Sequence, residues 1–128
     1  MKNQIIFDFY NTLYNPKTNV LFMGIPTLLR QLQPVYRLIL VTVEGKSRQL
    51  QISKLSLNKY FSKIIVCPQK SVFVFQKLLR EKSNTLIIGD RAEEEITIAQ
   101  TLKLQFIKVN PELENPAKTI RNQLIQKT

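Results

Sequence analysis

Five short apolar segments recur along the chain, and each has the length of a β-strand. They are residues 5–9, 38–43, 64–66, 86–88 and 106–109. Segments whose apolar residues are mostly consecutive, rather than at alternate positions, are typical of strands that are buried on both faces of a parallel sheet. The pattern therefore predicts a parallel sheet of five strands.

Longer segments between and after these strands carry apolar residues at the spacing of amphipathic helices. They are residues 25–32, 46–57, 71–81, 94–104 and 116–126. Strands that alternate with helices predict an α/β domain in which helices flank the sheet. The sequence contains no linker, low-complexity tract or internal repeat, so we expect one domain over residues 1–128.

The composition restricts the chemistry that this domain can perform. The chain has 128 residues with no histidine, and Cys67 is its single cysteine. These counts exclude a Ser-His-Asp or Cys-His site, a histidine-ligated metal, a cysteine-rich zinc site and an intrachain disulfide. Catalysis would depend on carboxylates, Lys or Arg side chains, hydroxyl groups, the thiol or a metal with oxygen ligands.

The first apolar segment lacks the pattern of a secretory signal, because Asp8 interrupts it and no small-residue cleavage site follows. The longest apolar runs are far shorter than the roughly 20 residues that cross a bilayer. We therefore expect a cytoplasmic protein without a membrane-spanning segment.

Polar residues follow four of the predicted strands at the point where each strand ends. The carboxyl ends of parallel strands meet at one edge of the sheet, where open α/β sheets bind ligands. Two carboxylates can bind Mg²⁺ there, a lysine and a hydroxyl can bind phosphoryl oxygens, and a carboxylate can act as a nucleophile. The residues at these strand ends are Asp8, Thr42, Lys70, and Asp90 with Glu94 and Glu95.

The order of these residues resembles the four motifs of the haloacid dehalogenase (HAD) superfamily of phosphohydrolases. Residues 5–13 are similar to its first motif, a hydrophobic strand that ends in Asp-x-Asp-x-Thr-Leu. Residues 40–42 resemble the second motif, and Lys70 resembles the lysine of the third. The fourth motif is similar to residues 87–90 together with Glu94 and Glu95, the acids four and five positions after Asp90. The resemblance covers residues 4 to about 110. It implies a three-layer, Rossmann-like HAD fold with strand order 5-4-1-2-3, numbered along the chain, and no cap domain.

The resemblance also implies a nucleophile and a magnesium site. Asp8 would attack phosphorus and become an aspartyl phosphate. Mg²⁺ would bind the carboxylates of Asp8 and Asp90 and the main-chain carbonyl of Tyr10. Glu94 or Glu95 would orient the water ligands of the metal.

Two further residues would bind the phosphoryl group, according to the same resemblance. Thr42 would donate a hydrogen bond to a phosphoryl oxygen, and Lys70 would offset the negative charge that develops in the transition state. The loop spacing leaves Lys46 as an alternative to Lys70. The expected function is hydrolysis of a phosphomonoester whose identity the sequence does not specify.

Tyr10 departs from the phosphatase pattern, which usually has an aspartate at this position as general acid and base. A phenol can donate a proton to a leaving group but is a poor base at neutral pH, so water activation would be weakened. The dehalogenase branch of the superfamily has tyrosine here, which leaves a 2-haloacid dehalogenase-like activity as an alternative. That branch acts under a cap domain and without Mg²⁺, whereas residues 15–24 leave no room for such a cap.

The charge balance leaves another class of function open. The chain has 19 Lys and Arg against nine Asp and Glu, a net charge of +10, and four of the acids lie within residues 90–95. A basic surface around an acidic centre attracts polyanions, nucleic acid among them. A catalytically weakened module that binds phosphate or polyanions is therefore the main alternative to an active phosphatase.

Overall fold

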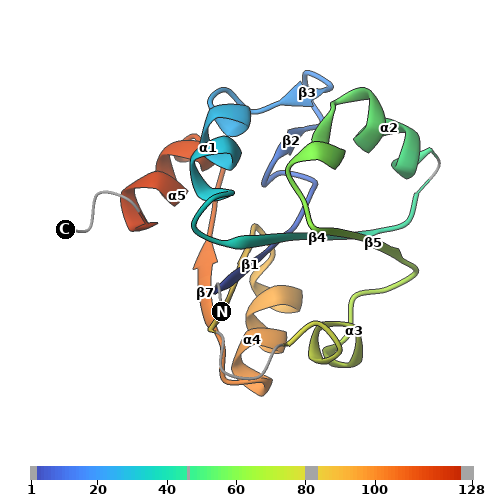
Figure 1. Ribbon diagram of the computed structural model, residues 1–128, viewed down its shortest axis with the longest axis vertical. Coiled ribbons are helices and arrows are strands. Elements are labelled where there is room, and N and C mark those ends of the chain that lie inside the picture. Colours follow the sequence, from blue (N-terminus) through green and yellow to red (C-terminus); the bar gives the residue numbers. More distant parts are fainter. Residues whose placement is uncertain (1–2, 46, 80–83, 125–128) are drawn as a thin grey trace.

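A parallel sheet of five strands forms the centre of the computed structural model, which describes residues 3–45, 47–79 and 84–124. The strands are β1 (Gln4–Phe7), β4 (Arg37–Val43), β5 (Lys63–Cys67), β6 (Thr85–Gly89) and β7 (Gln105–Lys108). They lie in the order β5-β4-β1-β6-β7, so β1 is central and pairs with β4 on one side and β6 on the other (Figure 1). If the five strands of this sheet are numbered along the chain and read from the β7 edge, the order is 5-4-1-2-3, as predicted.

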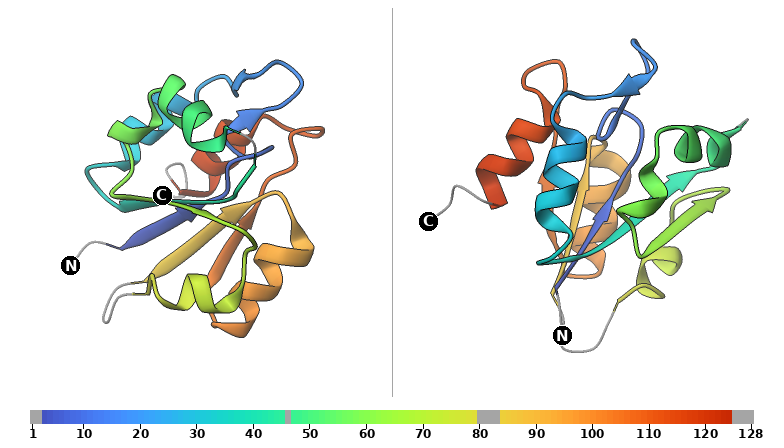
Figure 2. Two further views of the ribbon diagram at one scale, coloured as in Figure 1. Left: turned by 90° about the vertical axis from the view of Figure 1, so that its right-hand side faces the viewer. Right: turned by 45° about the horizontal axis from the view of Figure 1, so that its top comes forward.

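Helices cover both faces of the sheet and complete three layers. α1 (Ile25–Leu32), α2 (Arg48–Lys54) and α5 (Pro116–Leu124) lie on one face, and α3 (Val72–Gln76) and α4 (Thr97–Thr101) lie on the other (Figures 1 and 2). A 3-10 turn, η1 (Leu57–Lys59), follows α2, and a π-helical turn, η2 (Ala92–Ile96), leads into α4. The α/β class and the flanking helices predicted from the sequence are confirmed.

The two faces of β1 belong to two separate apolar cores. All four residues of the strand are buried. Ile5 and Phe7 pack toward α1, α2 and α5, whereas Ile6 packs with its strand partners Ile39 and Ile87 toward α3 and α4. Successive side chains of a strand point to opposite faces, so burial on both faces explains why three consecutive residues of this strand are apolar, while the buried Gln4 amide donates hydrogen bonds to Leu78 and Thr85.

A short antiparallel hairpin between β1 and α1 was not predicted. It consists of β2 (Tyr14–Asn15) and β3 (Val20–Leu21). Strands of two residues are too short to produce a periodic pattern in a sequence, so nothing in the pattern of apolar positions marked them. The hairpin and its flanking loops make up all of the chain between β1 and α1.

The observed helices differ from the predicted ones mainly at their ends. α1 has the predicted limits, but α2 begins later, α3 is only five residues long, and the fourth helical segment begins two residues early with η2. Ser47 and Ser56 have φ angles of 64° and 57°, left-handed values that interrupt the helix on both sides of α2. Lys46, residues 80–83 and the last two residues of the predicted final helix lie outside the described part of the chain.

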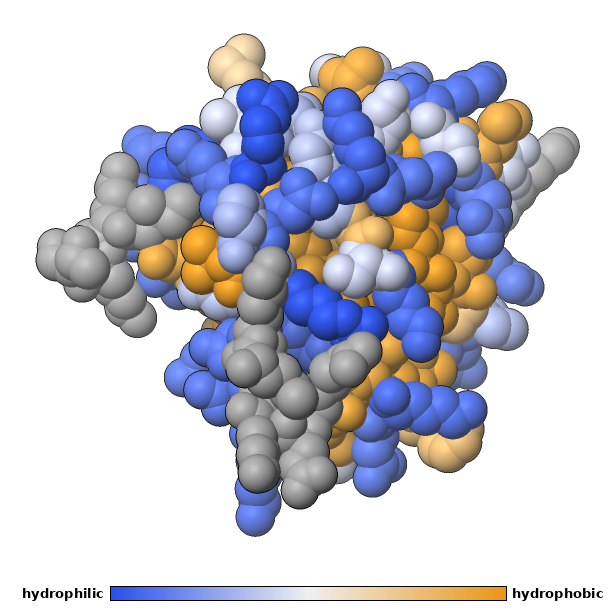
Figure 3. All heavy atoms as spheres, in the orientation of Figure 1, coloured by the Kyte–Doolittle hydropathy of each residue, from blue (hydrophilic) through white to orange (hydrophobic). Residues whose placement is uncertain are grey.

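The surface of the described residues is mixed in polarity. Hydrophilic side chains cover much of the face shown in Figure 3, with hydrophobic side chains visible between them. Within residues 3–45, 47–79 and 84–124, every helix is too short or too polar to cross a membrane. The large apolar side chains that are exposed are Tyr10, Val20, Met23, Val35, Leu50, Phe73 and Leu113.

Candidate functional site

The carboxyl edge of the sheet brings together side chains from three neighbouring strands. Asp8 directly follows β1, and its backbone N–H donates to the carbonyl oxygen of Ile88 in β6 at 2.9 Å. Asp90 directly follows β6, and Thr42 is the last residue but one of β4. Because β1 lies between β4 and β6, the three side chains start from adjacent positions at one edge.

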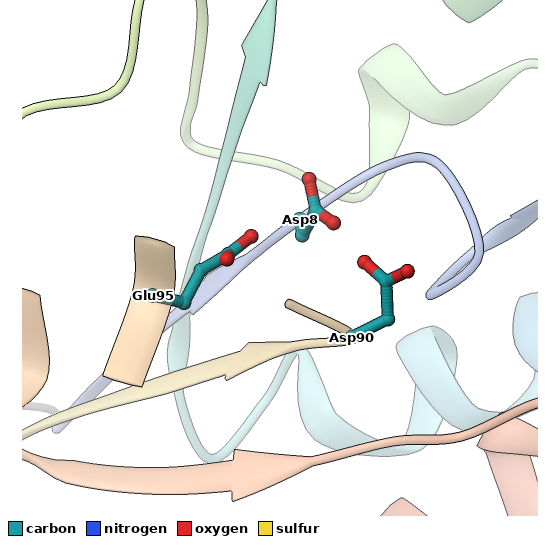
Figure 4. Close-up of side chains that lie close together, drawn as sticks. All are labelled: Asp8, Asp90 and Glu95. Atoms are coloured by element: carbon teal, nitrogen blue, oxygen red, sulfur yellow. The ribbon is translucent and has the colours of Figure 1, made fainter. Parts of the chain in front are cut away.

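Three carboxylates form an acidic cluster at this edge. One oxygen each of Asp8, Asp90 and Glu95 lies within 4.8 Å of the other two. The side chains come from the ends of β1 and β6 and from η2, and their carboxylates point toward a common space (Figure 4). Asp8 and Glu95 are buried, and Asp90 is half-buried. Hard divalent cations such as Mg²⁺ bind oxygen sets of this kind.

Glu95 reaches the cluster because the chain makes a π-helical turn shortly after Asp90. Gly89 leaves space for the side chain, since a Cβ at this position would lie only 3.1 Å from Cγ, Cδ and Oε1 of Glu95. Glu95 is 1% exposed, and its Oε2 has no hydrogen-bond partner among the described residues. A buried carboxylate oxygen without a partner is costly, which indicates that this atom binds a cation or water.

Lys70 lies between two of the clustered carboxylates. Its Nζ forms ion pairs with Asp8 and, at 3.0 Å, with Oε1 of Glu95. Lys70 stands just before α3, where Oγ of Ser71 accepts a hydrogen bond from the N–H of Val74 at 3.3 Å and so fixes the start of the helix. Burial lowers the pKa of Lys70, but attraction to Asp8 and Glu95 outweighs burial and raises the pKa above its usual value. The ammonium group therefore stays protonated.

The cluster carries more negative charge than Lys70 compensates. Burial raises the pKa of Asp90 to about 7, and the hydrogen bond and charge of Asp8 and the charge of Glu95 add to this shift. Burial also raises the pKa of Glu95, an effect that the charge of Lys70 opposes and the charge of Asp8 reinforces. Raised carboxyl pKa values mean that a proton, or a metal cation in its place, is favoured here. The oxygen set and the unpartnered Oε2 therefore fit an oxygen-liganded divalent cation.

Two threonine hydroxyls lie near the cluster. Oγ1 of Thr12 donates to Oδ2 of Asp8 at 3.5 Å, and Oγ1 of Thr42 is 3.5 Å from the carbonyl oxygen of Val43. The second contact is long for a hydrogen bond, so the Thr42 hydroxyl can turn to a ligand oxygen in the cleft. Thr12 was not predicted as a site residue, although its place in the first motif was a signal for it.

A cleft of about 340 Å³ adjoins the acidic cluster. Tyr10, whose side chain was expected to face the substrate, forms part of its wall and is 40% exposed. The wall also contains Arg48, a residue that sequence reasoning missed because no motif position marks it. The site residues predicted from the sequence that line the cleft are Asp8, Tyr10, Thr42, Lys70, Asp90 and Glu94.

The two candidate glutamates occupy different places. Glu95 belongs to the acidic cluster, whereas Glu94 lines the cleft and its Oε2 is 3.6 Å from Nη1 of Arg91. The sequence left both residues as candidates for the metal site, and the fold brings only Glu95 into contact with Lys70 among the described residues. Lys46, the alternative to Lys70, lies outside the described part of the chain.

Comparison with known proteins finds similarity at the level of structure. No protein-family model matches the sequence, and no curated protein matches it either. A haloacid dehalogenase-like family hydrolase from Streptococcus pneumoniae has a TM-score of 0.73 at 16% identity, over 95% of this chain and 91% of that chain. A HAD-superfamily hydrolase of subfamily IA from Geobacter sulfurreducens has a TM-score of 0.72 at 14% identity, over 97% of this chain and 100% of that chain.

Another similar structure contains magnesium. It is the HAD-type protein YfnB from Bacillus subtilis bound to magnesium, with a TM-score of 0.69 at 21% identity over 84% of this chain. The chain spans 57% of the length of YfnB. At these identities the likeness concerns the arrangement of the backbone. The fold of this chain is that of the haloacid dehalogenase-like hydrolases.

Proposed function

We propose that this protein is a Mg²⁺-dependent phosphomonoester hydrolase that works through an aspartyl phosphate on Asp8. The observation that carries the proposal is the buried cluster of Asp8, Asp90 and Glu95, in which one Glu95 oxygen has no partner among the described residues. Lys70 is paired with two members of this cluster, and the adjoining cleft leaves space for a substrate. Similarity in fold to HAD-type hydrolases supports the same reading.

The residues that would hold the metal are the three clustered acids, with the main-chain carbonyl of Tyr10 as a further ligand. When bound, Mg²⁺ would neutralise charge on the phosphoryl oxygens and orient the phosphoryl group for attack. Glu94 would act through water, because its oxygens are not among the clustered ones of the described residues. Thr42 would donate a hydrogen bond to a phosphoryl oxygen.

In the first half-reaction a carboxylate oxygen of Asp8 attacks phosphorus, and the bond between phosphorus and the ester oxygen breaks. The departing oxygen takes a proton from water in the cleft or from the Tyr10 hydroxyl, which then regains a proton from solvent. Lys70 offsets the charge of the transition state, since it stays protonated beside Asp8. The products of this step are the free alcohol and an aspartyl phosphate.

In the second half-reaction water attacks the phosphorus atom of the aspartyl phosphate. The bond between phosphorus and the Asp8 oxygen breaks, phosphate leaves, and a proton passes from the attacking water to solvent. Tyr10 is a poor base for this proton because a phenol is protonated at neutral pH. We therefore expect the second step to limit the rate.

The test is phosphate release from an aryl phosphate, with and without Mg²⁺, for the wild type and Asp8→Asn. The matched control is Glu112→Gln, which removes the same charge at an exposed position outside the acidic cluster. We expect Mg²⁺-dependent turnover in the wild type and the control, and only background release in Asp8→Asn. Turnover that persists in Asp8→Asn would contradict the mechanism.

A second candidate function, binding of polyanions, is favoured by the distribution of charge. Three of the nine acidic residues belong to the cluster, so the remainder of the chain is more basic than the net charge of +10 indicates. The test is binding of a single-stranded oligonucleotide at increasing salt. Tight binding that falls steeply with salt and is unchanged in Asp8→Asn would favour this function, and no binding near physiological salt would exclude it.

A further inference from the structure

Arg48 places a cation in the wall of the cleft, and no carboxylate of the described residues lies within ion-pair distance of it. It is the first residue of α2, it is half-buried, and it lines the cleft together with Asp8, Thr42 and Lys70. The helices and strands that carry these four residues are separated along the chain. The fold therefore brings Arg48 into the wall of the same cleft as Asp8, the group that would be phosphorylated.

The orientation of the Arg48 guanidinium is fixed on two sides. Nε donates to the carbonyl oxygen of Val43 at 3.2 Å, and Nη1 donates to Oε1 of Gln51 at 3.2 Å. The guanidinium carbon lies 4.2 Å from the ring centroid of Tyr10 and 5.2 Å from that of Phe9. An arginine that is stacked on an aromatic ring and hydrogen-bonded through Nε and Nη1 has little rotamer freedom left to lose when a ligand binds.

The ring of Tyr10 itself packs against two other aromatic rings. Its ring centroid lies 5.3 Å from that of Tyr14 and 5.9 Å from that of Phe9. The rings of Phe9 and Tyr14 stack on each other at 5.0 Å. Arg48 therefore stacks on a cluster of three aromatic rings, in which Tyr10 is the ring nearest to the guanidinium and is placed to act as its positioning residue.

The remaining donors of Arg48 have no partner among the described residues. No hydrogen bond is found for Nη2 there, and no carboxylate of the described chain lies within ion-pair distance of the guanidinium. The other two cations of the cleft wall are already paired, Lys70 with Asp8 and Glu95, and Arg91 with Glu94. Among the described residues of the cleft wall, Arg48 is thus the cationic side chain that forms no ion pair, and its charge is available to a ligand.

We propose that Arg48 binds a second anionic group of the substrate, carried by the part of the molecule that leaves. The substrate class is then a phosphomonoester whose alcohol bears a carboxylate or a further phosphoryl group. A guanidinium binds either group with two parallel hydrogen bonds, which an ammonium or a neutral donor does not. This proposal rests on the proposed function, because the first phosphoryl group must lie at Asp8.

The test measures binding rather than turnover, with substrate analogues that cannot be hydrolysed. We would titrate the protein with propylphosphonate and with 3-phosphonopropionate by calorimetry, at saturating Mg²⁺ and without Mg²⁺. Carboxylated phosphonates with one fewer and one more carbon cover the spacing between the two anions. Propane-1,3-bisphosphonate, which has a phosphonate in place of the carboxylate, distinguishes the two kinds of second anion.

The variants are Arg48→Gln and Arg48→Lys, with Arg30→Gln as the matched control. Arg30 is an exposed residue of α1 outside the cleft wall, so its replacement removes the same charge at a different place. We expect the wild type and the control to bind one of the doubly anionic ligands about tenfold more tightly than propylphosphonate, as one charged hydrogen-bonded pair provides. The ratio falls close to one in Arg48→Gln and is intermediate in Arg48→Lys.

Replacements of Tyr10 test whether it positions Arg48. Tyr10→Phe keeps the ring, so the preference for the doubly anionic ligand is retained, whereas Tyr10→Leu removes the ring and reduces the preference. A general loss of stability would weaken binding of both ligands alike and would leave their ratio unchanged. An unchanged ratio in Tyr10→Leu would overturn the positioning role.

The outcomes separate this proposal from the proposed function. Mg²⁺-dependent binding of propylphosphonate with no preference for any doubly anionic ligand would overturn the role of Arg48 and leave the hydrolase in place. A preference for a doubly anionic ligand that is retained in Arg48→Gln would also overturn the role of Arg48. If no phosphonate binds even with Mg²⁺, both proposals are wrong.

Discussion

Lys70 both fills a buried position and provides the counter-ion of two carboxylates. Its Nζ is paired with Asp8 and Glu95, and the residue is only 7% exposed. A buried ion pair is not necessarily stabilising in itself, but loss of one partner leaves the other charge buried without compensation. The lysine therefore allows two carboxylates to lie together at the edge of the sheet.

Replacement of Lys70 by methionine is expected to destabilise the metal-free protein by about 3–5 kcal/mol, because Asp8 and Glu95 lose their counter-ion. Urea unfolding in the presence of a chelator measures the change. Mg²⁺ should restore part of the lost stability, since a divalent cation at the cluster replaces the missing positive charge. The control Lys54→Met removes an exposed lysine of α2 and should change stability little. Equal effects of the two replacements would contradict this account.

In its resemblance to the first motif of HAD phosphatases, the chain has Tyr10 where that motif has an aspartate. We expect Tyr10→Asp to raise the turnover of an aryl phosphate, because a carboxylate can take the proton of the attacking water. Tyr10→Phe, which removes the hydroxyl but keeps the ring, should not raise it. Steady-state rates between pH 6 and 8 measure both effects. A fall in Tyr10→Asp would mean that Tyr10 is matched to a different chemistry.

The turn η2 is the element that decides which acid joins the acidic cluster. Three consecutive glutamates lie in it, and their sequence alone does not distinguish them. The π-helical turn directs Glu95 inward against Gly89 and Lys70, and leaves Glu94 in the cleft wall beside Arg91. One element thus provides both a buried carboxylate and a peripheral one.

Glu95→Gln and Glu94→Gln form a matched pair that tests this assignment. We expect Glu95→Gln to weaken Mg²⁺ binding at least about tenfold, because it removes one charge from a cluster of three carboxylates. Glu94→Gln should weaken binding by much less, since its carboxylate lies outside the cluster of described residues. Calorimetric titration with Mg²⁺ measures both. If Glu94→Gln weakened Mg²⁺ binding more than Glu95→Gln, Glu94 rather than Glu95 would be the metal ligand.

At the scale of the whole molecule, we expect the acidic cluster to make the stability of the fold depend on pH. The chain has no histidine, so few groups titrate between pH 5 and 8. In the folded metal-free protein the pKa of Asp90 is raised to about 7, mainly by burial, whereas an unfolded aspartate has a pKa near 4. The folded state therefore binds this proton more tightly, and its stability falls as the pH rises from about 4 through 7.

The Tm of the metal-free protein should accordingly be lower at pH 8 than at pH 5. Mg²⁺ should raise the Tm more at pH 8, because the carboxylates bind the metal in their deprotonated form. Thermal unfolding with chelator and with saturating Mg²⁺, at both pH values, measures the two effects. Asp90→Asn should remove most of this pH dependence. Stabilisation by Mg²⁺ that is greater at pH 5 would contradict the assignment.

The sequence by itself determined the layers, the strands and the edge at which the chemistry lies. The central strands β1, β4 and β6 are buried along most of their length, and this burial requires the apolar runs that predicted them, whereas the edge strands β5 and β7 are partly exposed. The position of Asp8, Thr42 and Asp90 at strand ends followed from the same pattern, because parallel strands end at a common edge. The two-residue strands of the hairpin left no such pattern.

Only the tertiary structure decided which side chains meet within the site. The choice of Glu95 over Glu94 for the acidic cluster depends on a π-helical turn and on the space above Gly89. The placement of Arg48 on Tyr10 depends on how α2 packs over the loop that follows β1. Periodic patterns record whether a residue is buried, whereas contacts between segments distant in the chain depend on the packing of whole elements, which local spacing does not encode.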